Sequence, residues 1–275
     1  LEVTRICKVC SNTFHGRYCN ICGEKVFEPH ERSLLNFFDT LLNAFTFLDG
    51  KFIVSLKLLL TRPGQLSRNI ADGVRVPYMK MVSLFFVANF FYFLFPVFDS
   101  YNSSLHTQLN SLGNHSVQAK EIVAKKLEKE QLEMKDFQRD YQSQSTNLSK
   151  LLIILLVLAF TGVLYVVNYS RTNFFFDHLL FSLEFYSFQL LFNAVIIANL
   201  FKGLIYVGGL GGFNWSVLLT DSFFTIVVLI SLSYFLARGQ HLFYRQKWYW
   251  VIPKTLLLIF LLPQTVHLYR KMLFY

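Results

Sequence analysis

The chain has 275 residues, of which 53% are hydrophobic, 17% aromatic and only 16% charged. Soluble domains are about 45–50% apolar and about 25% charged, and here the apolar residues also gather in long runs, so the composition argues against an ordinary soluble protein. The formal net charge of +9 is best explained by lysine and arginine at the inner face of a membrane, in contact with anionic lipids, and we expect no nucleic-acid partner.

All four cysteines lie in the polar residues 1–30, which we expect to form a cytoplasmic zinc ribbon. Two Cys-x2-Cys pairs, separated by eight residues, have the spacing of a tetrahedral zinc site, because each pair can place two thiolates on one ion. The predicted ligands are Cys7, Cys10, Cys19 and Cys22. Four protein ligands leave no position open for a substrate, so we expect a structural Zn²⁺ that supplies the folding free energy of this small module.

Two disulfide bonds are the alternative interpretation of the four cysteines. Disulfides within Cys-x2-Cys are tight and usually redox-active, and the inferred compartment is reducing, which favours zinc. The basic residues of the head are offset by Glu2, Glu24 and Glu28. Without a strong basic face, the head is not expected to bind nucleic acid.

Residues 31–79 are predicted to contain interfacial amphipathic helices and a linker. Between 33 and 60, polar and apolar residues recur on opposite helical faces, which is typical of a helix lying in the membrane interface. Pro63 and Gly64 are expected to end this helix. Basic residues before the first span should contact lipid headgroups; they are Arg62, Arg68, Arg75 and Lys80.

Residues 80–98 are predicted to form the first transmembrane helix, because about 20 apolar residues cross a bilayer. Residues 99–150 are hydrophilic and should form an extracytoplasmic loop with a charged helix at about 116–142. Residues 151–275 should form a membrane bundle of about four further helices. Their apolar stretches are 151–169, 174–201, 217–237 and 252–269, of which the last is interrupted by Lys254, Pro263 and Gln264.

The fold class predicted from these elements is an all-α polytopic membrane protein with about five transmembrane helices, a zinc-ribbon head and an interfacial amphipathic helix. With the N-terminus inside, inner segments carry sixteen lysines and arginines and outer segments ten. The positive-inside rule therefore predicts a cytoplasmic N-terminus and an outer C-terminus. Arg270 and Lys271 at the outer end argue mildly against this orientation. The first 30 residues lack the apolar run of a secretory signal.

Several stretches resemble a bacterial family of uncharacterised multi-spanning inner-membrane proteins with an N-terminal four-cysteine zinc ribbon, a domain of unknown function. The resemblance rests on "CKVCSNTFHGRYCNICGEK", on Arg62-Pro63-Gly64, on Gly73-Val74-Arg75-Val76-Pro77-Tyr78 and, more loosely, on His178-Leu179-Leu180-Phe181-Ser182-Leu183. The family pattern has further histidines after the last of these, where this chain has Glu184 and Tyr186. The resemblance implies zinc binding and a place in the inner membrane, with no assigned activity.

Ionisable residues within apolar stretches are the remaining candidate functional residues, because a charge in the membrane is costly. Glu184 lies near the middle of 174–201, and Asp177 lies seven residues earlier on the same helical face. His178 marks the inner end of this stretch, and Asp221 lies near the start of the next one. One hypothesis is a polar track that carries protons, ions or a small solute past Glu184.

The other hypothesis, which we favour, is that Glu184 is structural. It would be protonated, or bonded to Gln189, Asn193 or a neighbouring helix, since one mid-span carboxylate without a close basic partner is weak support for transport.

No catalytic motif of the metalloprotease, hydrolase or nucleotide-binding classes is present in the sequence. The glycine run 203–215 is predicted to be a loop between two spans. We therefore expect a non-enzymatic adaptor, assembly factor or accessory subunit that binds one or more protein partners, or a second copy, through its zinc ribbon and outer helix. The alternative is a transporter or channel that uses Glu184. A lipid-modifying enzyme would have only the headgroup-level arginines in its favour.

Overall fold

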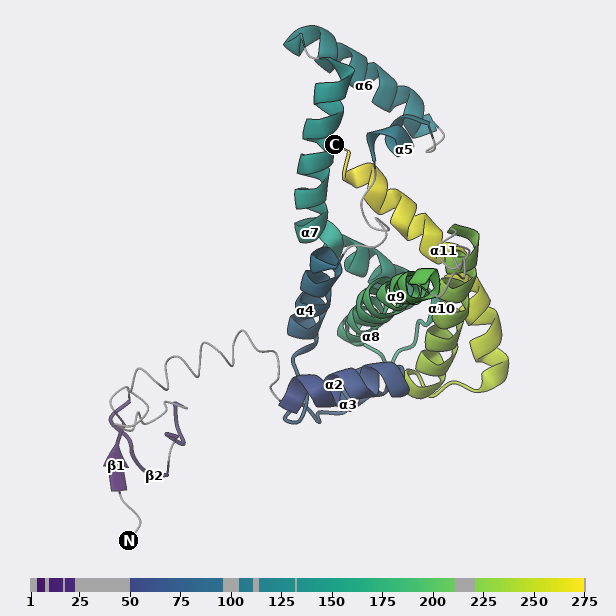
Figure 1. The fold of residues 1–275 in the computed structure, drawn as a ribbon. Coiled ribbons are helices and arrows are strands. Elements are labelled where there is room, and N and C mark those ends of the chain that lie inside the picture. Colours follow the sequence, from purple (N-terminus) through teal and green to yellow (C-terminus); the bar gives the residue numbers. More distant parts are fainter. Residues whose placement is uncertain are drawn as a thin grey trace. The chain divides into compact units, whose positions relative to one another are not determined.

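The computed structural model describes residues 4–7, 10–16, 18–22, 50–95, 104–110, 114–131, 133–210 and 221–274. The chain divides into two compact units, Leu1–Gly50 and Lys51–Tyr275, which Figure 1 shows as a small β-containing unit and a helical unit. Most of the predicted interfacial helix, residues 31–49, lies outside the described residues.

The first unit is a small antiparallel hairpin. Strands β1 (Thr4–Ile6) and β2 (Thr13–His15) pair with Thr4 opposite His15. A tight turn joins them, in which the Cys7 N–H donates to Asn12 O (2.8 Å). The hairpin thus holds the first cysteine pair in its turn.

The second unit is helical. Its elements are α2 (Gly50–Thr61), α3 (Gln65–Ala71), α4 (Met81–Leu94), α5 (Leu105–Asn110), α6 (Asn114–Glu130), α7 (Met134–Val167), α8 (Phe175–Phe188), the π-helix η2 (Gln189–Ile197), α9 (Ala198–Leu210), α10 (Asp221–Phe243) and α11 (Trp248–Met272).

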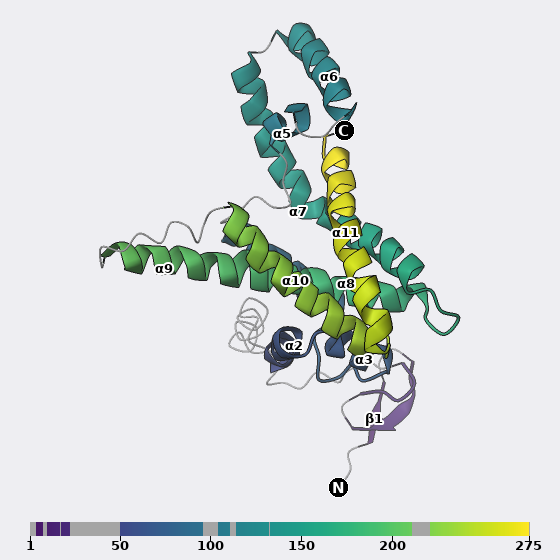
Figure 2. The ribbon, with the colours of Figure 1, turned by 90° about the vertical axis from the view of Figure 1, so that its right-hand side faces the viewer.

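Helix α8 is the central element of the second unit. It packs against α3, α4, α7 and α10, and every side chain from Leu180 to Leu191 is buried. A helix that is apolar on all sides belongs in such a position. Some of its polar side chains bond to neighbouring elements; for example, Ser182 Oγ donates to Val157 O of α7 (2.8 Å). Figure 2 shows α8 continuing into α9, with α10 and α11 crossing this long element.

Three helical segments within the described residues are long and apolar enough to cross a membrane: Phe175–Gly209, Ser222–Phe243 and Trp248–Met272. A fourth is present if Met134–Ser149 and Leu152–Val167, which meet at 57°, form one bent span. The expected number of about five is therefore not confirmed. The predicted first span is the 14-residue helix α4, which at 1.5 Å per residue extends about 21 Å and is shorter than the ~30 Å hydrocarbon core.

Helix α11 continues through Pro253 and Pro263, so the residues that interrupt the last apolar stretch do not break its helix. Part of the glycine run, which was predicted to be a loop, is also helical. Residues 203–210 of the glycine run belong to α9, whereas 211–220 lie outside the described residues. In an apolar environment, leaving a backbone N–H or C=O group without a hydrogen bond costs more free energy than placing glycine or proline in a helix. Neighbouring groups can also compensate for the N–H that proline lacks.

The predicted charged helix at 116–142 is two helices, α6 and the start of α7. Gln131, with a φ of 51°, reverses the chain between them. The reversal lets both helices bury their few apolar residues together, in a cluster of Leu105, Val123 and Phe137. Gln108 of α5 connects this cluster to α11, because its Nε2 donates to Arg270 O (2.7 Å).

Candidate functional site

The four predicted metal ligands converge in the first unit. All four Sγ atoms lie within 4.8 Å of one another, with Cys7–Cys22 at 3.4 Å and Cys10–Cys19 at 3.6 Å. Zinc–sulfur bonds of about 2.3 Å at tetrahedral angles would place sulfurs about 3.8 Å apart. The structure joins none of the four cysteines in a disulfide bond, so the four thiols form a site that could hold one metal ion.

Asn12 joins the two cysteine pairs. Its Nδ2 donates to Asn20 Oδ1 (2.7 Å) beside the second pair and lies 3.9 Å from Cys19 Sγ. The sequence did not identify Asn12, because asparagine is common in turns for reasons unrelated to metal binding. Such a contact to a ligand's sulfur orients the ligand and tunes its affinity for the metal.

The backbone of the second pair prepares Cys19 for metal binding. Hydrogen bonds from the backbone of Cys22 and then Ile21 lower the pKa of the Cys19 thiol to about 6. The thiolate is the form that binds metal. Cys19 and Cys7 are buried together with Phe14. This is the only hydrophobic cluster among the described residues of the first unit, and it includes two of the metal ligands.

Glu184 forms the main polar contact at the centre of the second unit. Its fully buried carboxyl group accepts hydrogen bonds from the Gly64 N–H at Oε1 (2.8 Å) and from the Ser67 N–H at Oε2 (2.8 Å). The Ser67 hydroxyl also donates to Oε2. The free N–H groups at the start of α3 are thereby satisfied by a side chain of α8. The partner is a neighbouring helix, as one of the structural alternatives for Glu184 anticipated.

A close backbone approach places α3 at this carboxyl group. Gly64 has a φ of 82°, and a Cβ atom there would lie 2.7 Å from Gly239 O of α10. A Cβ at Gly239 would in turn lie 2.7 Å from the Phe181 ring of α8. The turn at Pro63-Gly64 therefore does more than end α2, because it fits the α3 segment (residues 62–72) against both α8 and α10.

Replacing Gly64 by alanine should destabilise the second unit far more than replacing Gly73. Both residues have positive φ (82° and 95°), but a Cβ at Gly73 meets nothing within 4 Å. Gly73→Ala should cost about 1–2 kcal/mol for the left-handed conformation, and Gly64→Ala about 1–3 kcal/mol more for overpacking. Thermal unfolding of the purified protein in detergent, followed by tryptophan fluorescence, measures this. Equal shifts in Tm for both variants would contradict the close approach.

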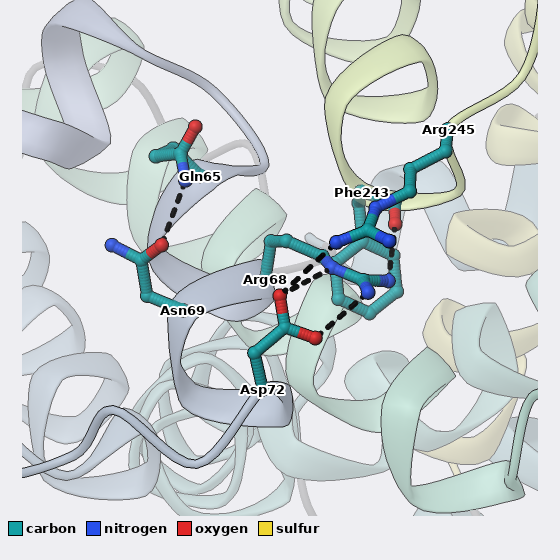
Figure 3. Close-up of polar contacts among 6 residues, drawn as sticks. All are labelled: Gln65, Arg68, Asn69, Asp72, Phe243 and Arg245. Carbon is teal, nitrogen blue, oxygen red and sulfur yellow. Dashed lines mark hydrogen bonds and ion pairs between the residues drawn. The ribbon is translucent and has the colours of Figure 1, made fainter.

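A second set of contacts fastens α3 to the end of α10 (Figure 3). The Arg68 guanidinium contacts both Asp72 oxygens (2.8 and 2.7 Å) and donates to Phe243 O (3.2 Å). Arg245 lies 3.5 Å from Asp72. Ion pairs this exposed contribute little stability, but their geometry fixes the position of α3 beside α10.

The four residues predicted to contact lipid headgroups have different environments. Arg68 contacts Asp72 and the Phe243 carbonyl, and Arg75 Nε donates to Ile70 O (3.4 Å). Arg62 and Lys80 are exposed. Headgroup contact stays a prediction for all four.

The other predicted intramembrane polar residues have separate partners. Asp177 accepts the Phe174 N–H (2.9 Å) and so caps the start of α8. His178 is buried, with Nδ1 2.8 Å from Tyr244 Oη. The Asp221 side chain lies outside the described residues. The structure thus places Asp177, His178 and Glu184 on one helix but gives each its own hydrogen-bond partner.

Residues 49–93 match the model of a family described as "Protein of unknown function (DUF3667)". The match covers α2, α3 and α4, including Gly64 and Ser67, which hold Glu184. The four-cysteine cluster lies outside the matched residues. No curated protein and no solved structure matches the chain.

Proposed function

We propose that this protein is a non-enzymatic adaptor of the bacterial inner membrane, whose cytoplasmic head binds a structural zinc ion and docks a cytoplasmic protein. The observation that carries the proposal is the exposure of apolar side chains around the metal site. Ile6 is 73% exposed, Tyr18 60% and Ile21 69%. These residues lie before, between and within the cysteine pairs, so the metal would hold them in a fixed arrangement.

The chemistry of the head supports contact rather than catalysis. Four thiolates complete the coordination of zinc and leave no position for a substrate or water. Exposed apolar side chains grouped on a small polar module are typical of protein interaction surfaces. A zinc-stabilised module can present such side chains without the large core that would otherwise bury them.

A second contact surface belongs to the outer helices in this proposal. Val117 is 61% exposed on α6 and Met134 47% on α7, on a hairpin otherwise rich in charge. Gln108 of α5 links this hairpin to α11, because its Oε1 lies 3.0 Å from His115 Nε2 of α6 and its Nε2 donates to Arg270 O. It would meet another protein or a second copy on the opposite side of the membrane.

The docking surface is tested by replacing Ile6 and Ile21 together with serine. Chemical crosslinking in native membranes, followed by affinity purification and mass spectrometry, should recover a specific partner with the wild-type chain and at least tenfold less with the double variant. That partner, once purified, should bind the wild-type protein and not the double variant. Metal content must stay the same in both, because no thiolate is changed.

Val76→Ser is the matched control, since Val76 is 82% exposed but belongs to the second unit. It should leave partner recovery unchanged. The proposal is wrong if the double variant retains the partner at the wild-type level, or if Val76→Ser reduces recovery equally.

A further inference from the structure

A cavity of about 380 Å³ lies between η2, α10 and α11. It is formed within three of the candidate membrane-spanning segments and does not include Glu184 or the metal ligands. Ligand pockets generally measure about 300–1,000 Å³, so this cavity is large enough for one small ligand or one acyl chain with its headgroup.

The π-helix supplies the deepest polar group of the cavity. Asn193 is only 3% exposed, and its Oδ1 has no hydrogen-bond partner among the residues that the structure describes. Its Nδ2 donates to Gln189 Oε1, and both residues line the cavity. An unsatisfied buried acceptor costs about 1–3 kcal/mol, and π-helical turns occur frequently at functional sites. A ligand hydroxyl would satisfy this acceptor.

Helix α11 adds a cationic group to the same cavity. Arg270 and His267 line it, one helical turn apart, and no acidic side chain is among the described residues of its wall. An arginine guanidinium matches the geometry of phosphate and carboxylate oxygens. The cavity therefore favours an anionic group.

The remainder of the wall is apolar, with side chains such as Val228, Leu232 and Leu262. It would contact a hydrocarbon chain. The volume is too small for a phospholipid with two chains, but one chain could occupy the wall and continue into the bilayer.

We propose that this cavity binds a single-chain lipid whose headgroup combines a phosphate with a free hydroxyl. Arg270 binds the phosphate, Asn193 Oδ1 accepts a hydrogen bond from the hydroxyl, and Val228 and its neighbours contact the chain. This inference is independent of the adaptor proposal, because it concerns other residues and a different ligand.

Photolabelling of the full-length protein in lipid nanodiscs tests the proposal. The probe is a lysophosphatidic acid with a diazirine in its chain, and labelled peptides are mapped by mass spectrometry. Label should concentrate on α10, α11 and η2, and excess unlabelled lysophosphatidic acid should remove it. A monoacylglycerol of the same chain should compete at least tenfold less well, because it lacks the phosphate, and an alkyl phosphate should also compete less well, because it lacks the hydroxyl.

Val228→Phe fills the cavity and should reduce labelling about tenfold. Ile226→Phe is the matched control, because Ile226 lies on the same helix, is 56% exposed and does not line the cavity; labelling should persist in it. Asn193→Leu keeps the volume and should abolish the difference between lysophosphatidic acid and the alkyl phosphate. Equal labelling of Val228→Phe and wild type, or label spread evenly over the bilayer-facing surface, would overturn the proposal.

Discussion

Replacing Glu184 by leucine is expected to destabilise the second unit by about 3–5 kcal/mol, because it removes the shared acceptor of several buried hydrogen-bond donors. The substitution leaves the Gly64 N–H, the Ser67 N–H and the Ser67 hydroxyl without their acceptor, and each unsatisfied buried donor costs about 1–3 kcal/mol. For a unit of this size the Tm should fall by roughly 6–20 °C. Thermal unfolding in detergent measures the change.

Asp177→Asn is the matched control, because Asp177 is a carboxylate on the same helix that only caps its first turn. Asp177→Asn should lower the free energy of unfolding of the second unit by about 1 kcal/mol. If Glu184→Leu is no more destabilising than Asp177→Asn, the structural role of Glu184 is wrong.

Glu184→Gln distinguishes the structural role from transport. Glutamine keeps one acceptor oxygen, so its Tm should fall between those of wild type and Glu184→Leu. If Glu184→Gln instead keeps the wild-type Tm and abolishes a proton or ion flux that the wild-type protein shows in proteoliposomes, a transporter or channel replaces the adaptor as the better proposal.

Replacing Cys19 by serine is expected to remove the metal and unfold the head. Structural zinc binding contributes about 10–16 kcal/mol in small modules at pH 7, far more than the cluster of Phe14 and its neighbours can supply. Elemental analysis should show one zinc per wild-type chain and near zero in the variant. The Tm of the second unit should not change, because the two units are separately compact.

Asn12→Ala is the graded control for the metal site. It keeps all four thiolates but removes the contact to Asn20 and Cys19, so zinc affinity should fall about 10–100-fold without loss of the site. Competition with a chromophoric chelator measures this affinity. If purified wild-type protein contains no metal and its thiols resist alkylation until reduced, the disulfide alternative is correct instead.

Local features of the sequence were predicted well. The cysteine spacing sufficed for the four-thiol cluster, because both pairs lie within 16 consecutive residues, in the hairpin turn and just after its second strand. Long apolar runs located the candidate membrane-spanning helices of the second half, because hydropathy depends on each segment alone. The loop predicted for the glycine run is wrong for residues 203–210, which are helical, since propensities measured in water underestimate how strongly an apolar environment favours helix.

Long-range features could not be predicted from the sequence. The sequence predicts that Pro63 and Gly64 end a helix. Nothing near Gly64 in the sequence indicates that its N–H donates to the carboxyl group of Glu184, 120 residues later. The sequence also did not predict the π-helix, because Gln189 and Asn193 have the i, i+4 spacing of an ordinary α-helix. The break at Gln131 depends on which apolar residues pack together in space, a property that the charged pattern of 116–142 does not encode.

The separation between Gly64 and Glu184 also has a consequence for biosynthesis. Ribosomes add about 5–20 residues per second, so the N–H groups of Gly64 and Ser67 exist for roughly 6–24 s before Glu184 is made. The α3 segment also lies against α10, where Gly64 approaches Gly239 and Arg68 donates to Phe243 O, and α10 is synthesised later still. The α3 segment can therefore dock only after α8 and α10 have been made, which makes its docking a late step in assembly. Protease sensitivity of this segment in nascent chains that end before residue 184, and protection in longer ones, would reveal that order.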